Sequence, residues 1–203
     1  DYYVAWVDCY ELKKHKIGKG FVAFARWSSK TYKFDEKKLY KSFKKSNKLF
    51  NTIPISLAWP LVKILFNRTN IKKFNNLFYL FKKITSVFKL HKNKLVFFTD
   101  YNFMHNQIPD IKIIHAPYGF LEFQPLIPRD QIKKFIPELF DLCKNYKTES
   151  TLCGLKLHSK DEFTISYSDD AFSIGIDVPL KNRKIKEIKE FANKLFTLTS
   201  KFN

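Results

Sequence analysis

Residues 116–203 contain an ordered series of strand and helix patterns, and no other part of the chain limits the fold so strongly. In the first pattern, Leu121 and Phe123 alternate with the polar Glu122 and Gln124, as in a strand with one buried side. The helical patterns place apolar residues at three- and four-residue steps, which gives each helix one buried face. The series runs strand, helix, strand, strand, strand, helix, over residues 116–128, 130–146, 153–158, 163–167, 172–178 and 183–202.

This order is typical of an α+β fold in which helices pack on one face of a mainly antiparallel sheet. We therefore predict that the apolar sides of the strands face the two helices. The opposite face of the sheet would collect Glu122, Gln124, Lys156, His158, Ser173, Gly175 and Asp177. Such a face is either a solvated surface, which is usual for an antiparallel sheet, or a wall for a polar ligand. The pattern alone leaves both interpretations open.

The first half of the chain predicts a strand hairpin, two helices and a short strand, over residues 2–9 with 21–27, 55–66, 70–88 and 95–99. Proline lacks a backbone N–H and its ring clashes with the preceding helical turn. We therefore expect Pro60 to limit the first of these helices. For the same reason, Pro137 should either kink the helix over residues 130–146 or mark its true start.

The formal net charge of +18 raises the question of a nucleic-acid partner. Lysine and arginine together number 37, but only Arg26, Arg68, Arg129 and Arg183 are arginines. Proteins that read bases and phosphates favour the planar, bidentate arginine fork. We therefore expect no nucleic acid as a partner, while attraction to an anionic membrane surface stays open.

No motif of a self-contained enzyme is found in the sequence. The Gly-rich phosphate loops GxGxxG and GxxxxGK[ST] are absent, and so is the GxSxG of a nucleophile elbow. The five histidines lack HExxH and zinc-finger spacing, so we predict no metal site. Cys9, Cys143 and Cys153 form no CxxC pair, and two of them lie on predicted apolar faces. Reduced thiols in the core are the favoured interpretation.

Six short motifs follow one another along most of the chain: Val4–Asp8 with Ile17–Gly20, Asn70–Leu80, Phe97–Asp100, Tyr118–Gln124 with Ile127–Pro128, Gly154–Leu157 and Ile176–Pro179. In this order they resemble segments of the FAD-linked oxidases that act on decaprenylphosphoryl-ribose. Those enzymes are the oxidase half of a 2'-epimerase in the synthesis of arabinan precursors. Their matching segments include Ala-Trp-(Phe/Ile)-Asp, Gly-Phe-Leu-Gln-Tyr-Gln and Val-Phe-Lys-Leu.

The resemblance implies that residues 1–203 form the cap domain, which binds the substrate, of a flavoenzyme of the vanillyl-alcohol-oxidase type. The flavin-binding domain lies outside this sequence, so the chain alone is expected to be an inactive part of an FAD-dependent oxidoreductase. The implied reaction oxidises a sugar hydroxyl, in a polyprenyl-phosphate pentose, by hydride transfer to the flavin. Implied partners are this substrate, the flavin-binding domain and a partner reductase. The implied setting is bacterial cell-wall biosynthesis, in the cytoplasm, at the membrane or in the periplasm.

The same resemblance implies roles for individual residues. Lys156 would be catalytic, because its ammonium could hold a substrate phosphate or stabilise charge on the reduced flavin. Gln124 and Lys156 would contact FAD, and Trp6 would form an apolar wall beside flavin and sugar. The implied substrate-binding residues are Trp6, Phe98, Glu122, Gln124, His158, Ser173 and Gly175. Without the resemblance, Trp6 reads as a core residue, and Gln124 and Lys156 read as solvated surface residues.

Several site positions depart from the family. Glu122 replaces a Gln, Phe98 a Tyr, Ser173 an Asn and His158 a Phe, and Gly175 stands where mycobacterial members carry a Cys. An acid in place of an amide, and a hydroxyl in place of Asn, leave the exact sugar open. Two alternatives therefore stand beside the main hypothesis. One is an aldonolactone or other sugar oxidase of the same superfamily, and the other is a non-catalytic basic module that binds anionic lipid or nucleic acid.

Overall fold

The computed structural model describes residues 2–13, 16–29, 48–49, 52–65, 68–88, 95–98, 101, 111–150, 153–164 and 169–203. The chain divides into two compact units. The first unit joins residues 1–27 to residues 118–203, and the second unit comprises residues 28–117. The first unit therefore brings the predicted N-terminal hairpin together with the C-terminal series of strands and helices.

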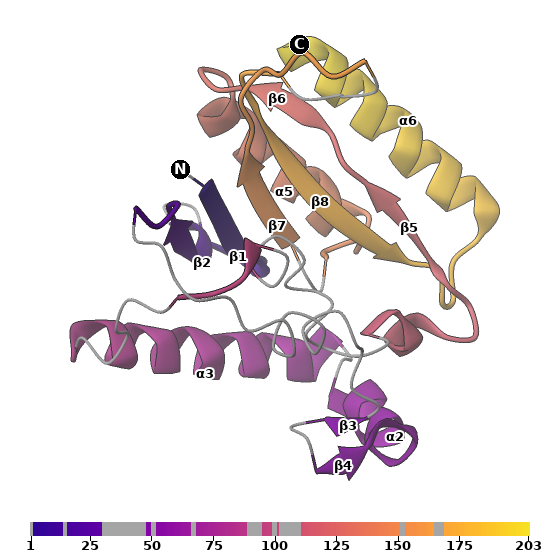
Figure 1. The fold of residues 1–203 in the computed structure, drawn as a ribbon. Helices are drawn as coiled ribbons and strands as arrows, with labels where there is room; N and C mark the ends of the chain where they lie inside the picture. The colour runs from indigo at the N-terminus through magenta and orange to yellow at the C-terminus, as the bar shows by residue number, and fades with distance from the viewer. Residues whose placement is uncertain are drawn as a thin grey trace. The chain divides into compact units, whose positions relative to one another are not determined.

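A six-stranded antiparallel sheet forms the centre of the first unit (Figure 1). Its spatial order is β2 (Lys16–Ala25), β1 (Tyr2–Lys13), β7 (Cys153–Leu157), β8 (Ala171–Pro179) and β5 (Phe120–Phe123), with β6 (Leu126–Pro128) also paired to β8. β1 and β2 form the predicted hairpin, with Trp6 opposite Phe21. β1 then pairs with β7, and this pairing makes the hairpin part of the larger sheet.

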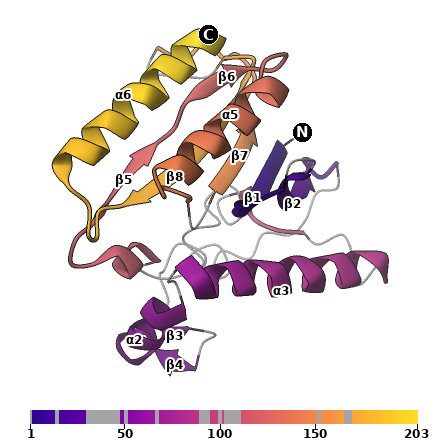
Figure 2. The same cartoon turned by 180° about the vertical axis from the view of Figure 1, so that it is seen from behind.

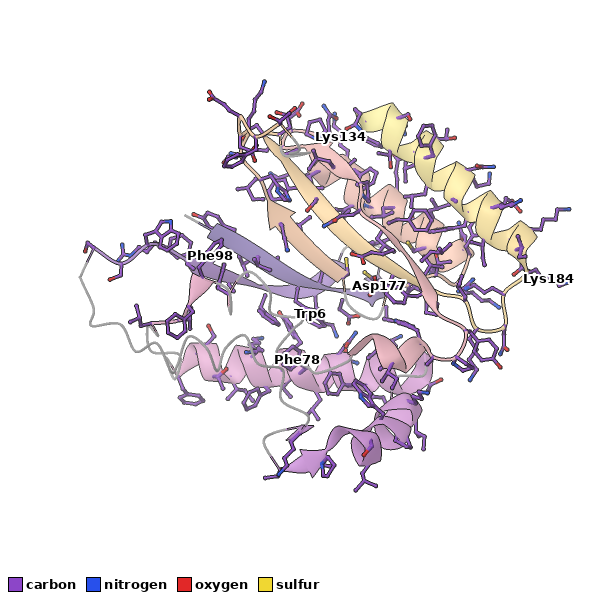
Figure 3. All side chains as sticks on the ribbon, turned by 45° about the vertical axis from the view of Figure 1, so that its right-hand side comes forward. Trp6, Phe78, Phe98, Lys134, Asp177 and Lys184 are labelled. Carbon is purple, nitrogen blue, oxygen red and sulfur yellow. The ribbon has the colours of Figure 1, made fainter. Side chains whose placement is uncertain are left out.

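Two helices, α5 (Ile132–Asn145) and α6 (Ile185–Phe202), cover one face of this sheet (Figures 1 and 2). The apolar residues that alternate along β8, the strand on which Figure 3 labels Asp177, are buried on that face. The side chains of Ile174, Ile176 and Val178 are at most 1% exposed. The helices contribute Phe135, Leu139, Phe140, Phe191 and Leu195 to the same core. The predicted α+β fold, a mainly antiparallel sheet with helices on one face, is therefore confirmed.

The C-terminal end of α5 is closed by a left-handed residue. Lys147 has φ 54°, its N–H donates to the Lys144 carbonyl at 3.1 Å, and the Thr148 N–H donates to the Cys143 carbonyl at 2.7 Å. This pair of bonds is a Schellman motif, in which glycine is the usual left-handed residue. In this chain the position is occupied by Lys147 instead of glycine.

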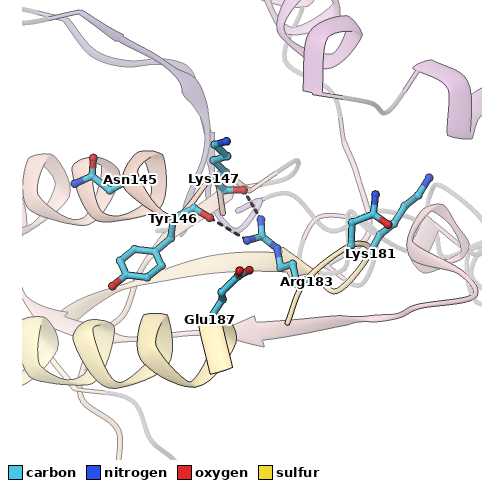
Figure 4. Close-up of a pocket in the computed structure, with 7 residues that line it drawn as sticks. Asn145, Tyr146, Lys147, Lys181, Arg183 and Glu187 are labelled. Atoms are coloured by element: carbon cyan, nitrogen blue, oxygen red, sulfur yellow. Dashed lines mark hydrogen bonds between the residues drawn. The ribbon is translucent and has the colours of Figure 1, made fainter. Parts of the chain in front are cut away.

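Arg183 joins this helix end to the sheet and to the start of α6 (Figure 4). Its guanidinium donates Nη1 to the Tyr146 carbonyl at 2.9 Å and Nη2 to the Lys147 carbonyl. Its Nε donates to the Pro179 carbonyl, at the end of β8, at 2.8 Å. A polar pocket of about 490 Å³ surrounds this junction, lined by Asn145, Tyr146, Lys147, Lys181, Asn182, Arg183 and Glu187. Because the guanidinium is committed to carbonyl oxygens, we assign it a structural role.

Several expectations about local structure were wrong. Pro60 lies inside α2 and does not limit it, and Pro137 lies inside α5 and does not mark its start. A kink at Pro137 stays a prediction. Phe163 is outside any strand and 79% exposed, while Ile165 and Tyr167 lie outside the described residues. β7 pairs directly with β8 instead. No strand is found over residues 95–98, and Ile185 is exposed rather than inward.

The second unit contains the predicted helices α2 (Ile55–Leu65) and α3 (Arg68–Val87), with the short β3 (Lys48–Leu49), β4 (Ile53–Pro54) and 3-10 helix η2 (Ile111–His115). The Asn70 amide donates to the Ile64 carbonyl at 3.1 Å, which links the end of α2 to the start of α3. Trp59 and Ile71 are buried in this unit. Among the described helices, none combines the length and the apolar character needed to cross a lipid bilayer.

Candidate functional site

The sheet face opposite α5 and α6 carries most of the residues predicted to form a site. Lys156 lies opposite Ser173, and Gly154 lies opposite Gly175. On the other side of β7, Trp6 lies opposite Gly154. Directly opposed residues of antiparallel strands share one face. Since the intervening Leu155 and Ile174 belong to the helix-covered core, these five residues lie on the other face, which we call the site face.

Gln124 extends the site face toward the far edge of the sheet. β5 and β6 pair with β8 in one register, with Phe123 opposite Ile176 and Leu126 opposite Ser173. Gln124 stands between these two segments, so the register places it level with Gly175, and its side chain is exposed. One row therefore crosses the sheet from Trp6 through Gly154 and Gly175 to Gln124, and Lys156 and Ser173 belong to the next row.

The two central residues of this row form a floor without side chains. A Cβ added to Gly154 would meet no atom within 4 Å, and one added to Gly175 would meet only the Gly154 carbonyl oxygen, at 3.9 Å. Gly20 is different, because its Cβ would lie 2.4 Å from the Trp6 carbonyl oxygen. Gly20 therefore serves the fold, while the floor at Gly154 and Gly175 leaves space for a ligand.

The aromatic end of the row is held by a neighbouring ring. Trp6 stacks on Phe21 of β2, with ring centroids 5.6 Å apart and an interplanar angle of 28°. Trp6 is half-buried on the site face, so it is not a residue of the helix-covered core. Sequence reasoning missed both Phe21 and Gly154. Their signals were an aromatic residue facing Trp6 across a predicted hairpin, and a glycine facing Gly175 across predicted strands.

His158 and Ser173 form a hydrogen-bonded pair beside Lys156. The distance from His158 Nε2 to Ser173 Oγ is 2.7 Å, and the Ser173 side chain is only 1% exposed. Arg129 fixes the backbone here, because its Nη2 donates to the His158 carbonyl at 3.1 Å and pairs with Asp170 at 2.5 Å. Burial, with a smaller contribution from the Lys156 charge, lowers the pKa of His158 below its ordinary value. His158 is therefore neutral at pH 7, and Lys156 contributes a positive charge to this part of the face.

Glu122 lies at the opposite end of the site face from Lys156. It is opposite Asp177 in the sheet and exposed. Four residues along a strand separate the level of Glu122 from that of Lys156, which corresponds to roughly 13 Å. The site face therefore has a cationic end at Lys156 and an anionic end at Glu122 and Asp177, with the glycine floor between them.

Two further sets of predicted residues belong to the second unit and to the core of the first unit. Phe98 belongs to the second unit, with a side chain 41% exposed, and its role stays a prediction.

The three cysteines are free and buried in the core of the first unit, so the prediction of reduced core thiols is confirmed. Contact with Cys153, together with burial, raises the pKa of Cys9 well above its ordinary value, and burial raises that of Cys143 to about 12. Both are therefore neutral thiols at physiological pH.

The site face suits one side of a flavin ring but not a whole FAD. The Gln124 amide and the Lys156 ammonium are hydrogen-bond donors that could meet ring oxygens, and the glycine floor leaves room for a flat group. The five glycines of the chain form no phosphate loop that could hold the diphosphate. The described residues contain no cluster of three or more side chains able to hold a metal ion.

Comparison with known proteins adds no family name to this geometry. No family model and no curated protein sequence matches the chain. The resemblance carried by the six motifs therefore supports a proposal but does not assign the chain to a family.

Proposed function

We propose that this chain is the substrate-binding part of an FAD-dependent oxidoreductase that oxidises a sugar hydroxyl, most simply in a polyprenyl-phosphate pentose. The observation that carries the proposal is the row formed by Trp6, Gly154, Gly175 and Gln124, with Lys156 beside it, on a face that the helices leave uncovered. In the resembling oxidases the positions that match Trp6, Gln124 and Lys156 belong to the substrate pocket. The antiparallel register supports the proposal because it gathers residues that are up to 169 positions apart in sequence, from Trp6 to Gly175.

The proposed role of Lys156 follows from its charge. A phosphate or a developing negative charge beside it would accept a charge-assisted hydrogen bond, which is about twice as strong as a neutral one. Because His158 is neutral at pH 7, it does not compete with Lys156 for the anion. His158 and Ser173 instead form a hydrogen bond with each other, and this bond stiffens the end of the face at which the phosphate would bind.

The remaining residues of the row would hold the sugar. Trp6 provides an apolar wall, and its stacking on Phe21 fixes the orientation of the indole. Gln124 can donate and accept hydrogen bonds at the other end of the row, as a sugar hydroxyl requires. A bound flavin would supply the hydride acceptor. The contribution of this chain is therefore to orient the sugar carbon and to exclude water, which can lower a reaction barrier by several kcal/mol.

A ligand titration of the chain tests this proposal. We expect a short-chain isoprenyl-phosphoryl pentose to shift the backbone amide NMR signals of Trp6, Gly154 and Gly175. The variant Lys156→Gln should weaken binding by about tenfold, because one charge-assisted hydrogen bond is lost. Lys160→Gln is the matched control, since Lys160 is an exposed lysine just beyond β7.

The same titration separates the alternatives. A neutral aldonolactone that binds as tightly as the phosphate ester, with no effect of Lys156→Gln, would favour the other sugar oxidases of the superfamily. Shifts confined to scattered lysines, with equal losses for Lys156→Gln and Lys160→Gln, would contradict a pocket on the site face.

A further inference from the structure

Helix α3 exposes an apolar stripe that the described part of its own unit does not cover. Phe74, Leu77, Phe81, Ile84 and the following Phe88 recur at steps of three and four residues along one side of the helix. All five are exposed, Leu77 to 67% and Phe81 to 58%. The exposed Leu80 and Val87 widen this sector to about 140° of the helix circumference. We call these seven residues the α3 stripe.

The borders of the α3 stripe differ in character. At one border, the side chains of Ile71, Asn75 and Thr85 are buried. At the other border lie the exposed Lys72 and Lys83. A helix with a wide apolar sector, lysines at its edge and low overall hydrophobicity is the type that lies flat in a membrane interface.

The charge of the surrounding sequence narrows the choice of partner. Residues 37–99 contain fifteen Lys and Arg residues and no Asp or Glu, so they carry +15 of the net charge of +18. Two copies of α3 packed along their stripes would bring Lys72 and Lys83 of both copies together, and like charges at short distances repel. The partner must therefore be both apolar and anionic. A bilayer that contains anionic lipids meets both conditions, whereas a nucleic acid would leave the stripe in water.

We propose that α3 docks on an anionic lipid bilayer, with the α3 stripe among the acyl chains and the bordering lysines at the lipid phosphates. Lysine side chains reach the phosphates while their methylene stems stay in the apolar layer. This inference goes beyond the proposed oxidoreductase role and does not depend on it, since it concerns residues of the second unit. The two can therefore fail separately.

Vesicle flotation of the full chain tests the inference. We expect the chain to float with vesicles that contain phosphatidylglycerol, to stay unbound with pure phosphatidylcholine, and to be released as salt is raised. The double variant Leu77→Gln with Phe81→Gln keeps the charge and should lower the partition coefficient at least tenfold, roughly the effect of removing two large apolar side chains from lipid. Both side chains are exposed, so the fold should survive, as circular dichroism would show.

Charge is tested separately. Lys72→Gln with Lys83→Gln should lower binding about tenfold on anionic vesicles. Lys133→Gln with Lys194→Gln, an equal loss of charge on exposed sites of α5 and α6, should change binding less than twofold. A fluorophore on Leu77→Cys should move into an apolar environment on binding, while one on Ser86→Cys should not.

Four results would overturn the inference. They are no flotation with anionic vesicles, unchanged binding of the Leu77→Gln, Phe81→Gln variant, equal losses for both lysine pairs, or a dimer that forms through the stripe in solution. The chain could instead bind nucleic acid tightly, with or without the stripe residues, and not bind vesicles. That result would show that the positive charge serves a nucleic-acid partner.

Discussion

Gly154 is the residue whose importance the structure raises most. It lies between Trp6 and Gly175 on the site face, and a side chain there would project into open space. A glycine in the interior of a strand costs roughly 0.5 to 1 kcal/mol relative to alanine. Since the backbone at this position needs no glycine, the missing side chain matters for what lies above the sheet rather than for the fold.

Cysteine labelling tests this placement. We expect Gly154→Cys to react readily with a small maleimide, because the new thiol would point into open space on the site face. Ser173→Cys, at a side chain only 1% exposed, should react slowly, and Cys9, Cys143 and Cys153 should not react until the chain unfolds. Mass spectrometry gives the number of labels. Slow labelling of Gly154→Cys in a folded chain would show that the floor is covered.

The pair of His158 and Ser173 gives a second test at the level of single residues. Burial and the Lys156 charge both favour the neutral imidazole, so the pKa of His158 lies below 6.5 in the folded chain. The unfolded state then binds more protons as the pH falls through 6.5, and stability contributed by neutral His158 is complete above that pH and declines below it. Titration of the His158 ring signal by NMR measures this pKa directly. Lys156→Met should raise it, since one of its two causes is removed. A pKa that stays unchanged in Lys156→Met would place the ammonium away from the imidazole.

The helices show which features of an element the sequence pattern predicts, namely the buried face, and which it does not, namely the limits of the helix. The apolar periodicity of α5 predicted its buried residues, including Phe135 and Leu139. Pro137 did not limit the helix, because the burial of each large side chain is worth about 1.5 to 3 kcal/mol and together these outweigh a cost of about 3 kcal/mol for the proline. Ile185 is exposed because it begins α6 and lies about 100° around the helix from the buried stripe.

Strand pairing was predictable only in part. The alternation along β1, β5, β7 and β8 assigned the correct residues to each face, and the expected hairpin of β1 and β2 is present. The pairing of β1 with β7 joins segments about 150 residues apart, and no local pattern specifies it. The opposition of Gly154 and Gly175 follows from register, which sequence leaves open when no short turn sets it. The candidate site could therefore be predicted as a list of residues but not as a row.

The Schellman motif at the end of α5 predicts how a substitution at Lys147 changes the stability of the fold. Lys147 holds a left-handed φ of 54°, which costs a residue with a side chain about 1 to 2 kcal/mol, and its side chain is exposed. Lys147→Gly should therefore raise the free energy of unfolding by roughly 0.5 to 1 kcal/mol, after the greater freedom of glycine in the unfolded state is allowed for. Urea denaturation measures the change. The control Lys144→Gly, within the last helical turn, should lower stability by about 1 kcal/mol. Destabilisation by both changes would contradict the assigned Schellman motif.

At the level of the whole molecule, the site face and most of the positive charge belong to different units. The first unit holds the sheet, its core and the site face, while residues 37–99, which belong to the second unit, carry most of the positive charge. The proposals for substrate binding and for membrane docking therefore rest on different parts of the chain. Together they describe a protein that takes a lipid-linked sugar at a membrane surface, and each can be tested without the other.

If the site face presents a sugar substrate to a flavin, as we propose, that substrate should reduce a flavin bound to the protein. The protein encoded by the complete gene would be purified, loaded with FAD and mixed without oxygen with an isoprenyl-phosphoryl pentose. We predict that the visible flavin absorption disappears. Lys156→Gln should slow this change by about tenfold or more, and Lys160→Gln should leave it unchanged. A gene product that binds no FAD, or a bound flavin that stays oxidised with the phosphoryl pentose and with neutral sugars alike, would contradict the account.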